Sequence, residues 1–164
     1  MAEPLNWLDE VIIVNESADE RVPGDVSVYR SENEALIGIE SWWVKDGEGF
    51  AFTATGVRLT LGIGPFNEVD IIGREPCPEG PEIVLGWLHA LAVATLEARS
   101  RAAATGRVFL SEAEEQGALP ATVEGLLAYT ACPRIPGRDW LPIGCTLLLA
   151  VIAVLLMLIL LKLT

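Results

Sequence analysis

Hydrophobic and polar residues alternate or mix along most of the chain, whereas its last part is almost wholly hydrophobic. Apolar residues fill Val11–Val14, which can form a strand. Val26–Arg30 reads VSVYR, an alternation typical of a half-buried strand. Ser31 then precedes Glu34 by three positions, the spacing of a helix capping box. We therefore expect a short helix that begins after Ser31 and ends near Glu40.

Three further strands are expected between residues 50 and 72. Phe50–Ala54 is followed by a Thr-Gly pair, in which glycine supplies the positive φ angle of a tight hairpin turn. Val57–Ile63 alternates apolar and polar positions, as expected of the returning strand. A Gly-Pro pair ends it, and Glu68–Ile72 is the next candidate strand. Strands joined by such short turns predict an antiparallel meander.

Helices are expected in the part that follows the meander. Pro81 fits the first position of a helix and Gly106 fits its stop, which brackets about 25 residues. Ser111–Gln116 is acidic, and Ala118–Ala131 is expected to form a further short helix. The sequence thus predicts an acidic cytosolic α+β domain over residues 1–130, in which a small antiparallel sheet packs against helices.

The end of the chain is almost wholly apolar. Leu141–Leu161 contains 21 residues without a charge, and a helix of that length spans about 31 Å, close to the thickness of a bilayer core. We therefore expect one C-terminal transmembrane helix over 141–163, after a short Pro/Gly linker over 131–140. Tryptophan and lysine suit its two interfaces. The residues expected to anchor the helix are Trp140, Leu147, Val151, Leu155, Leu161 and Lys162.

Flanking charges predict the orientation of this helix. Arg134 and Arg138 precede it and only Lys162 follows it, which favours a cytoplasmic N-terminal domain. The opening MAEPLNWLDE is acidic and does not resemble a signal peptide. We expect a tail-anchored, single-pass membrane protein with its N-terminal domain in the cytoplasm and the lipid bilayer as one partner. The same helix would equally serve an accessory subunit of a larger membrane complex.

The charge balance excludes one large class of partners. The chain has 11 basic and 23 acidic residues, a net charge of −12 and a pI near 4.4. Nucleic-acid binders generally need a basic surface, so no nucleic acid is expected as a partner. An acidic domain instead speeds its encounter with a basic protein.

The sequence shows no catalytic or metal-binding motif. The single histidine, His89, lies inside the apolar part of the long predicted helix, where a core position is expected. Cys77, Cys132 and Cys145 are far apart and form neither a zinc spacing nor a disulfide framework. Phosphate-binding glycine loops and nucleophile motifs are also missing from the sequence. We therefore expect a non-enzymatic protein without a cofactor or a metal.

Two adjacent tryptophans are the clearest candidate contacts. On an extended segment, Trp42 and Trp43 would point to opposite faces, so one is expected in the core and the other on the surface. Exposed tryptophan is frequent among the residues that dominate binding energy at interfaces. The alternative is that both pack beneath the long helix.

The succession VSVYRSENEALIGIESWWVKDGEGFAFTATGVRLTL resembles small bacterial α+β proteins that serve as immunity partners in polymorphic toxin systems. The features in common are a strand, a helix capped at Ser31, an aromatic–Asp–Gly turn at Trp43, Asp46 and Gly47, and the hairpin GFAFTATGVRLTL. The resemblance covers about residues 26–75. It implies a non-enzymatic protein that binds and blocks a toxin domain. A membrane helix departs from the usual soluble form of that family.

These observations lead to two functional hypotheses. The first is a membrane-anchored immunity protein whose carboxylates cover the basic face of a cognate toxin. The second is an accessory single-pass subunit that contacts other subunits of a membrane complex. The residues expected to bind the partner are Trp42, Trp43, Asp46, Glu48, Glu68 and Asp70.

Overall fold

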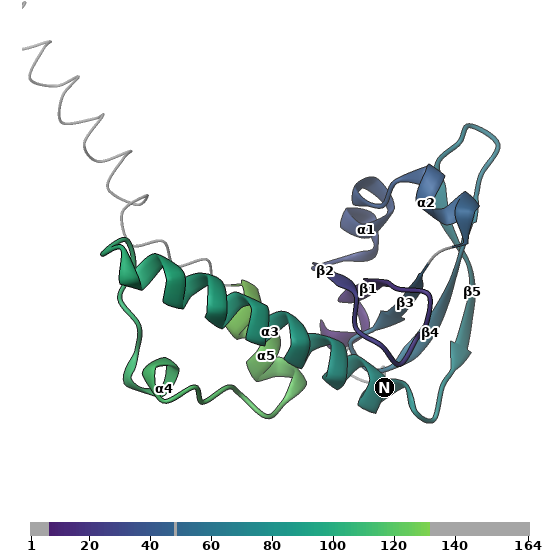
Figure 1. The fold of residues 1–164 in the computed structure, drawn as a ribbon. Coiled ribbons are helices and arrows are strands. Elements are labelled where there is room, and N and C mark those ends of the chain that lie inside the picture. The colour runs from purple at the N-terminus through teal and green to yellow at the C-terminus, as the bar shows by residue number, and fades with distance from the viewer. Residues whose placement is uncertain (1–6, 48, 132–164) are drawn as a thin grey trace, which may run out of the picture.

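A computed structural model describes residues 7–47 and 49–131 of the chain. These residues form an α+β fold around one antiparallel sheet of five strands in the order β2-β1-β3-β4-β5 (Figure 1). The strands are β1 (Ile12–Glu16), β2 (Asp25–Tyr29), β3 (Phe50–Thr53), β4 (Val57–Ile63) and β5 (Val69–Pro76). The helices are the short 3-10 helix η1 (Trp7–Asp9), α1 (Glu32–Gly38), α2 (Ser41–Asp46), α3 (Gly80–Ala104), α4 (Glu112–Glu115) and α5 (Val123–Ala131).

Helices cover both faces of the sheet, because successive residues of a strand point to opposite sides. On one side, Ile12 of β1 packs in a core with residues of α1 and α2, among them Trp43. On the other side, Ile13 packs with Phe52 of β3 and with residues of α3 and α5. Figure 1 shows α1 and α2 on one face and α3 on the opposite face. The predicted sheet packed against helices is confirmed.

The predicted meander is confirmed as β3–β4–β5. The turn between β3 and β4 closes with the N–H of Gly56 donating to the carbonyl of Thr53 at 2.9 Å, and Gly56 has a φ angle of +88°. β4 pairs with β5 along its whole length, with an irregularity in the register between Thr60 and Leu61. The first strand of the chain joins this meander by pairing with β3 and completes the sheet with β2.

Two helix predictions are confirmed closely. Ser31 caps α1, since its side chain accepts a hydrogen bond from the backbone N–H of Glu34 at 3.2 Å. The Glu34 carboxylate accepts from the N–H of Arg30 at 2.7 Å and so fixes the entry into the helix. The long helix α3 has 25 residues, with Pro81 in its first turn and Gly106 just beyond its end.

Two local expectations are wrong. Ser41–Asp46 is not extended but forms α2, in which the N–H of Trp43 donates to the carbonyl of Glu40 at 3.1 Å. His89 is exposed rather than buried, because the buried positions of α3 fall on the opposite side of the helix.

The main correction to the predicted fold concerns the expected transmembrane helix. Among residues 7–47 and 49–131, no helix is both long enough and apolar enough to cross a membrane. The longest of them, α3, carries four charged residues along its 25 positions and packs one side on the sheet. The span Leu141–Leu161, residues 132–140 of the predicted linker and the six predicted anchor residues lie outside the described residues, whereas Ala131 is the last residue of α5. The membrane and single-pass assignments therefore gain no support from the described fold.

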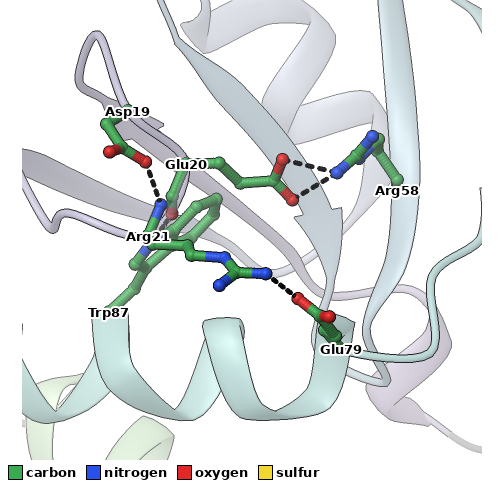
Figure 2. Close-up of polar contacts among 6 residues, drawn as sticks. All are labelled: Asp19, Glu20, Arg21, Arg58, Glu79 and Trp87. Atoms are coloured by element: carbon green, nitrogen blue, oxygen red, sulfur yellow. Dashed lines mark hydrogen bonds and ion pairs between the residues drawn. The ribbon is translucent and has the colours of Figure 1, made fainter.

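Hydrogen bonds and ion pairs connect the loop between β1 and β2 to β4 and α3 (Figure 2). The Glu20 carboxylate pairs with Arg58 of β4 at 2.6 Å, and the Glu20 carbonyl accepts from Nε1 of Trp87 in α3 at 2.8 Å. Arg21 pairs with Glu79, which directly precedes α3. The guanidinium of Arg58 also lies over the ring of Phe52 and has a raised pKa, chiefly because of its hydrogen bond to Glu20. These contacts join three elements and are structural in character.

Candidate functional site

The structure brings together two segments that carry predicted contact residues. Helix α2 contributes Trp42 and Asp46, and the turn between β4 and β5, with the start of β5, contributes Phe66, Glu68 and Asp70. We call these five residues the α2–turn surface. Figure 1 shows α2 beside the β4–β5 hairpin.

Asn67 holds the turn against α2. Its side-chain amide donates a hydrogen bond to the hydroxyl of Ser41 at 2.7 Å, and its amide oxygen accepts one from the ammonium of Lys45. Both partners lie on one side of α2, because residues four apart in a helix are neighbours. The Asn67 backbone has a φ angle of +70°, which asparagine tolerates better than most residues. The tie therefore depends on the identity of residue 67 in two independent ways.

The turn is also closed by its own hydrogen bonds. The N–H of Gly64 donates to the carbonyl of Glu68 at 2.8 Å, and the N–H of Asn67 donates to the carbonyl of Gly64 at 3.1 Å. The Glu68 side chain accepts from the N–H of Phe66 at 2.8 Å. These bonds order the backbone on both sides of Phe66 before any partner binds. A preorganised loop loses less conformational entropy on binding than a free one.

Two aromatic side chains stand on this ordered surface. Phe66 is 90% exposed and Trp42 is 57% exposed. The indole N–H of Trp42 donates to the carboxylate of Glu40, which restricts the ring without burying it. Exposed aromatic groups held in place have the properties of interface anchors, since they add large apolar area at low entropic cost.

Exposed carboxylates lie on the same two segments as the aromatic pair. Asp46, Glu68 and Asp70 are exposed. The ion pairs among the described residues involve different carboxylates, each paired with an arginine. These are the carboxylates of Glu20, Glu32, Glu79, Glu97 and Glu114. The three carboxylates of the surface thus keep their charge unpaired by a Lys or Arg of the described chain. Such a surface complements a basic partner.

The structure places the predicted contact residues in different environments. One of the two tryptophans was expected on the surface and the other in the core. Trp42 is exposed, whereas Trp43 is 7% exposed and belongs to the core beneath α2. The Nε1 of Trp43 has no hydrogen-bond partner in the described part of the structure. Glu48 lies outside the described residues.

Sequence reasoning missed the residues that assemble the surface. Ser41, Lys45 and Asn67 were not expected to interact, and Phe66 was not expected to be a contact residue. The sequence feature that could have indicated Phe66 is the succession Gly-Pro-Phe-Asn, which places a large apolar residue inside a polar turn. Asparagine at such a position indicates a positive φ angle, but nothing in the sequence shows that the turn meets α2.

A second polar cluster lies at the far end of α3. The Glu114 carboxylate pairs with Arg99 at 2.7 Å and accepts hydrogen bonds from Ser111 and from the hydroxyl of Tyr129. Burial raises the pKa of Glu114, but the Ser111 bonds, the charge of Arg99 and the Tyr129 bond together lower it below its ordinary value. The pKa of Tyr129 is raised by burial and by the neighbouring carboxylate. The cluster joins α3, α4 and α5 and has the properties of a structural centre.

In residues 7–47 and 49–131, no group of three or more His, Cys, Asp or Glu side chains is arranged so that it could hold a metal ion. Comparisons with protein-family models, curated proteins and solved structures find no match for the chain.

Proposed function

We propose that the chain is a non-enzymatic protein-binding domain that recognises a basic protein through the α2–turn surface. One observation carries this proposal: two exposed aromatic side chains, Trp42 and Phe66, stand on segments that Asn67 ties together. The tie holds the two segments that carry these anchors against each other, and aromatic anchors supply much of the binding energy at protein interfaces.

The charge of the surface supports a basic partner. Asp46, Glu68 and Asp70 are exposed on the two segments that carry the aromatic pair, and the whole chain carries a net charge of −12. Such a field accelerates association with a positively charged protein and repels an acidic one.

The class of partner proposed is a cognate toxin, which would make this chain an immunity protein. The resemblance of residues 26–75 to such proteins supports this class, since that region contains α2 and the β4–β5 turn. In this role the domain blocks its partner by covering a basic surface rather than by chemistry.

The test is a pull-down with the full-length chain as bait and the separately expressed products of the genes next to its own as candidates. We expect one basic protein to be retained at low salt and released progressively as salt rises, because exposed charges are screened within about 10 Å at 0.1 M salt. We also expect co-expression of the chain to rescue cells from that protein. Binding that is absent or insensitive to salt would contradict the proposal.

Matched variants locate the surface. Trp42→Ala and Phe66→Ala should each weaken binding by about tenfold or more. Trp7→Ala and Phe109→Ala are the controls, since these side chains are 55% and 85% exposed elsewhere in the fold. Both controls should bind within about twofold of the original chain. Equal losses in the two sets of variants would show that a different surface binds the partner.

A further inference from the structure

A cavity of about 200 Å³ opens directly beside the α2–turn surface. It lies where the end of α2 meets β3 and β4, and its walls include Trp43, Val44, Gly47, Gly49, Leu59 and Leu61. A Cβ built at Gly47 would meet no atom within 4 Å, so the wall is open on that side. The residue before Gly47 is Asp46, which belongs to the α2–turn surface.

The cavity exists because two neighbouring strands part. The register of β3 with β4 runs only to the pair Ala51–Leu59, whereas β4 continues for four residues, to Ile63. Among the described residues, no strand pairs with this last stretch of β4 on its β3 side. Backbone polar groups need a hydrogen-bond partner when water is excluded, so this edge offers carbonyl acceptors to a ligand that brings donors.

We propose that this cavity receives a lysine or arginine side chain of the basic partner. The inference rests on the proposed function and names the group that the partner inserts. Val44, Leu59 and Leu61 present apolar walls to the aliphatic stem of such a side chain. The cationic end then lies near the indole of Trp43 and the unpaired edge of β4, and Asp46 directly precedes the lining residue Gly47 in the chain. Each of these groups attracts a cation.

Size and charge both favour this occupant. A cavity of about 200 Å³ holds one long side chain, but it is too small for a helix or a strand. The exposed carboxylates of Asp46 and Glu68 lie on α2 and on the turn beside it, so a cation gains electrostatic energy on approach, whereas an anion is repelled. The indole of Trp43 is held by packing, and its N–H has no hydrogen-bond partner among the described residues.

The test compares two tripeptide probes that differ only in charge and head group. Acetyl-Gly-Arg-Gly-amide and acetyl-Gly-norleucine-Gly-amide are titrated into the ¹⁵N-labelled full-length chain, and the indole N–H signals are followed by NMR. We expect a saturable shift of the Trp43 signal, assigned with Trp43→Phe, for the arginine peptide alone. The Trp87 signal should not move, because its N–H is already bonded to the Glu20 carbonyl. A shift with both peptides, or with neither, would overturn the inference.

Variants separate this inference from the proposed function. Val44→Phe places a larger ring in the cavity wall and should abolish the arginine-dependent shift, while Val28→Phe, a half-buried valine on β2, should not. Asp46→Asn should weaken the arginine peptide by about two- to fivefold, and Asp25→Asn should leave it unchanged. If the pull-down partner depends on Trp42 and Phe66 but binds Val44→Phe normally, the cavity proposal fails and the binding function stands. If the partner does not depend on Trp42 and Phe66, the proposed function itself fails.

Discussion

The side-chain amide of Asn67 donates a hydrogen bond to the hydroxyl of Ser41 at 2.7 Å, across 26 positions of the chain. This single contact joins the β4–β5 turn to helix α2, and the ammonium of Lys45 strengthens it by donating to the oxygen of the same amide. The two backbone segments that carry the exposed rings of Trp42 and Phe66 are held together as a consequence.

Asn67→Ala should loosen the surface while leaving the core intact. Alanine loses both side-chain hydrogen bonds and is strained at a φ angle of +70°, so we expect a loss of about 1–2 kcal/mol in the free energy of unfolding. Urea denaturation measures this loss.

Asn67→Gly separates the two effects, because glycine accepts the backbone angle but lacks the amide. It should recover most of the stability and still bind the partner weakly. Recovery of full binding by Asn67→Gly would show that the tie to α2 does not order the surface.

Two glycines of α3 should respond to alanine in opposite directions. A Cβ at Gly80 would collide with the backbone of Gly56 in the β3–β4 turn, so Gly80→Ala should destabilise the fold by about 2–4 kcal/mol. A Cβ at Gly86 meets nothing within 4 Å on the exposed side of the helix, so Gly86→Ala should stabilise it by about 0.5–1 kcal/mol. Thermal melts of both variants check the prediction, and a loss of stability in Gly86→Ala would contradict the described packing of α3.

Asn15 should be among the least replaceable polar residues of the sheet. It is fully buried, its amide donates to the carbonyl of Val22 at 3.1 Å, and its oxygen accepts from the N–H of Gly24 at 2.7 Å. Asn15→Ala leaves both backbone groups unpaired, and we expect a loss of about 2–3 kcal/mol in chemical denaturation. Asn33→Ala, on the exposed side of α1, is the control and should change stability by less than about 0.5 kcal/mol.

Acid should weaken the junction of α3, α4 and α5. The pKa of Glu114 is lowered in the folded state from its ordinary value of 4.5, so its ionised form stabilises the fold above that pH. This stabilisation is lost as pH falls from 4.5 through the lower folded pKa. Glu114→Gln should flatten the acid limb of a stability profile measured between pH 3 and pH 7. An unchanged limb would show that other carboxylates control acid unfolding.

Local patterns predicted most of the fold. Alternation in Val57–Ile63 and the Thr-Gly pair before it were sufficient for the hairpin, because a tight turn and its strands are neighbours in sequence. Pro81 and Gly106 bracketed α3 for the same reason. The exposure of His89 could not be predicted, since an apolar helix has no pattern that shows which side faces the sheet.

The candidate site was harder to predict than the fold. Trp42 and Asp46 were recognised by residue type, although the segment that carries them is a helix that ends at Gly47 in the left-handed conformation. The contact between Asn67 and Ser41 depends on the order of the strands and on the placement of α2 over β4. No short pattern encodes such a non-local contact, so Phe66 becomes a candidate contact residue only once the folded structure brings its neighbour Asn67 to α2.

Hydrogen exchange of the free chain and of its complex with the pull-down partner tests the central claim most directly. We predict that the partner slows exchange in residues 41–46 and 64–70 and leaves η1 and α5 unchanged. Slower exchange confined to the groove between η1 and α5, lined by Trp7 and Leu127, would contradict the account.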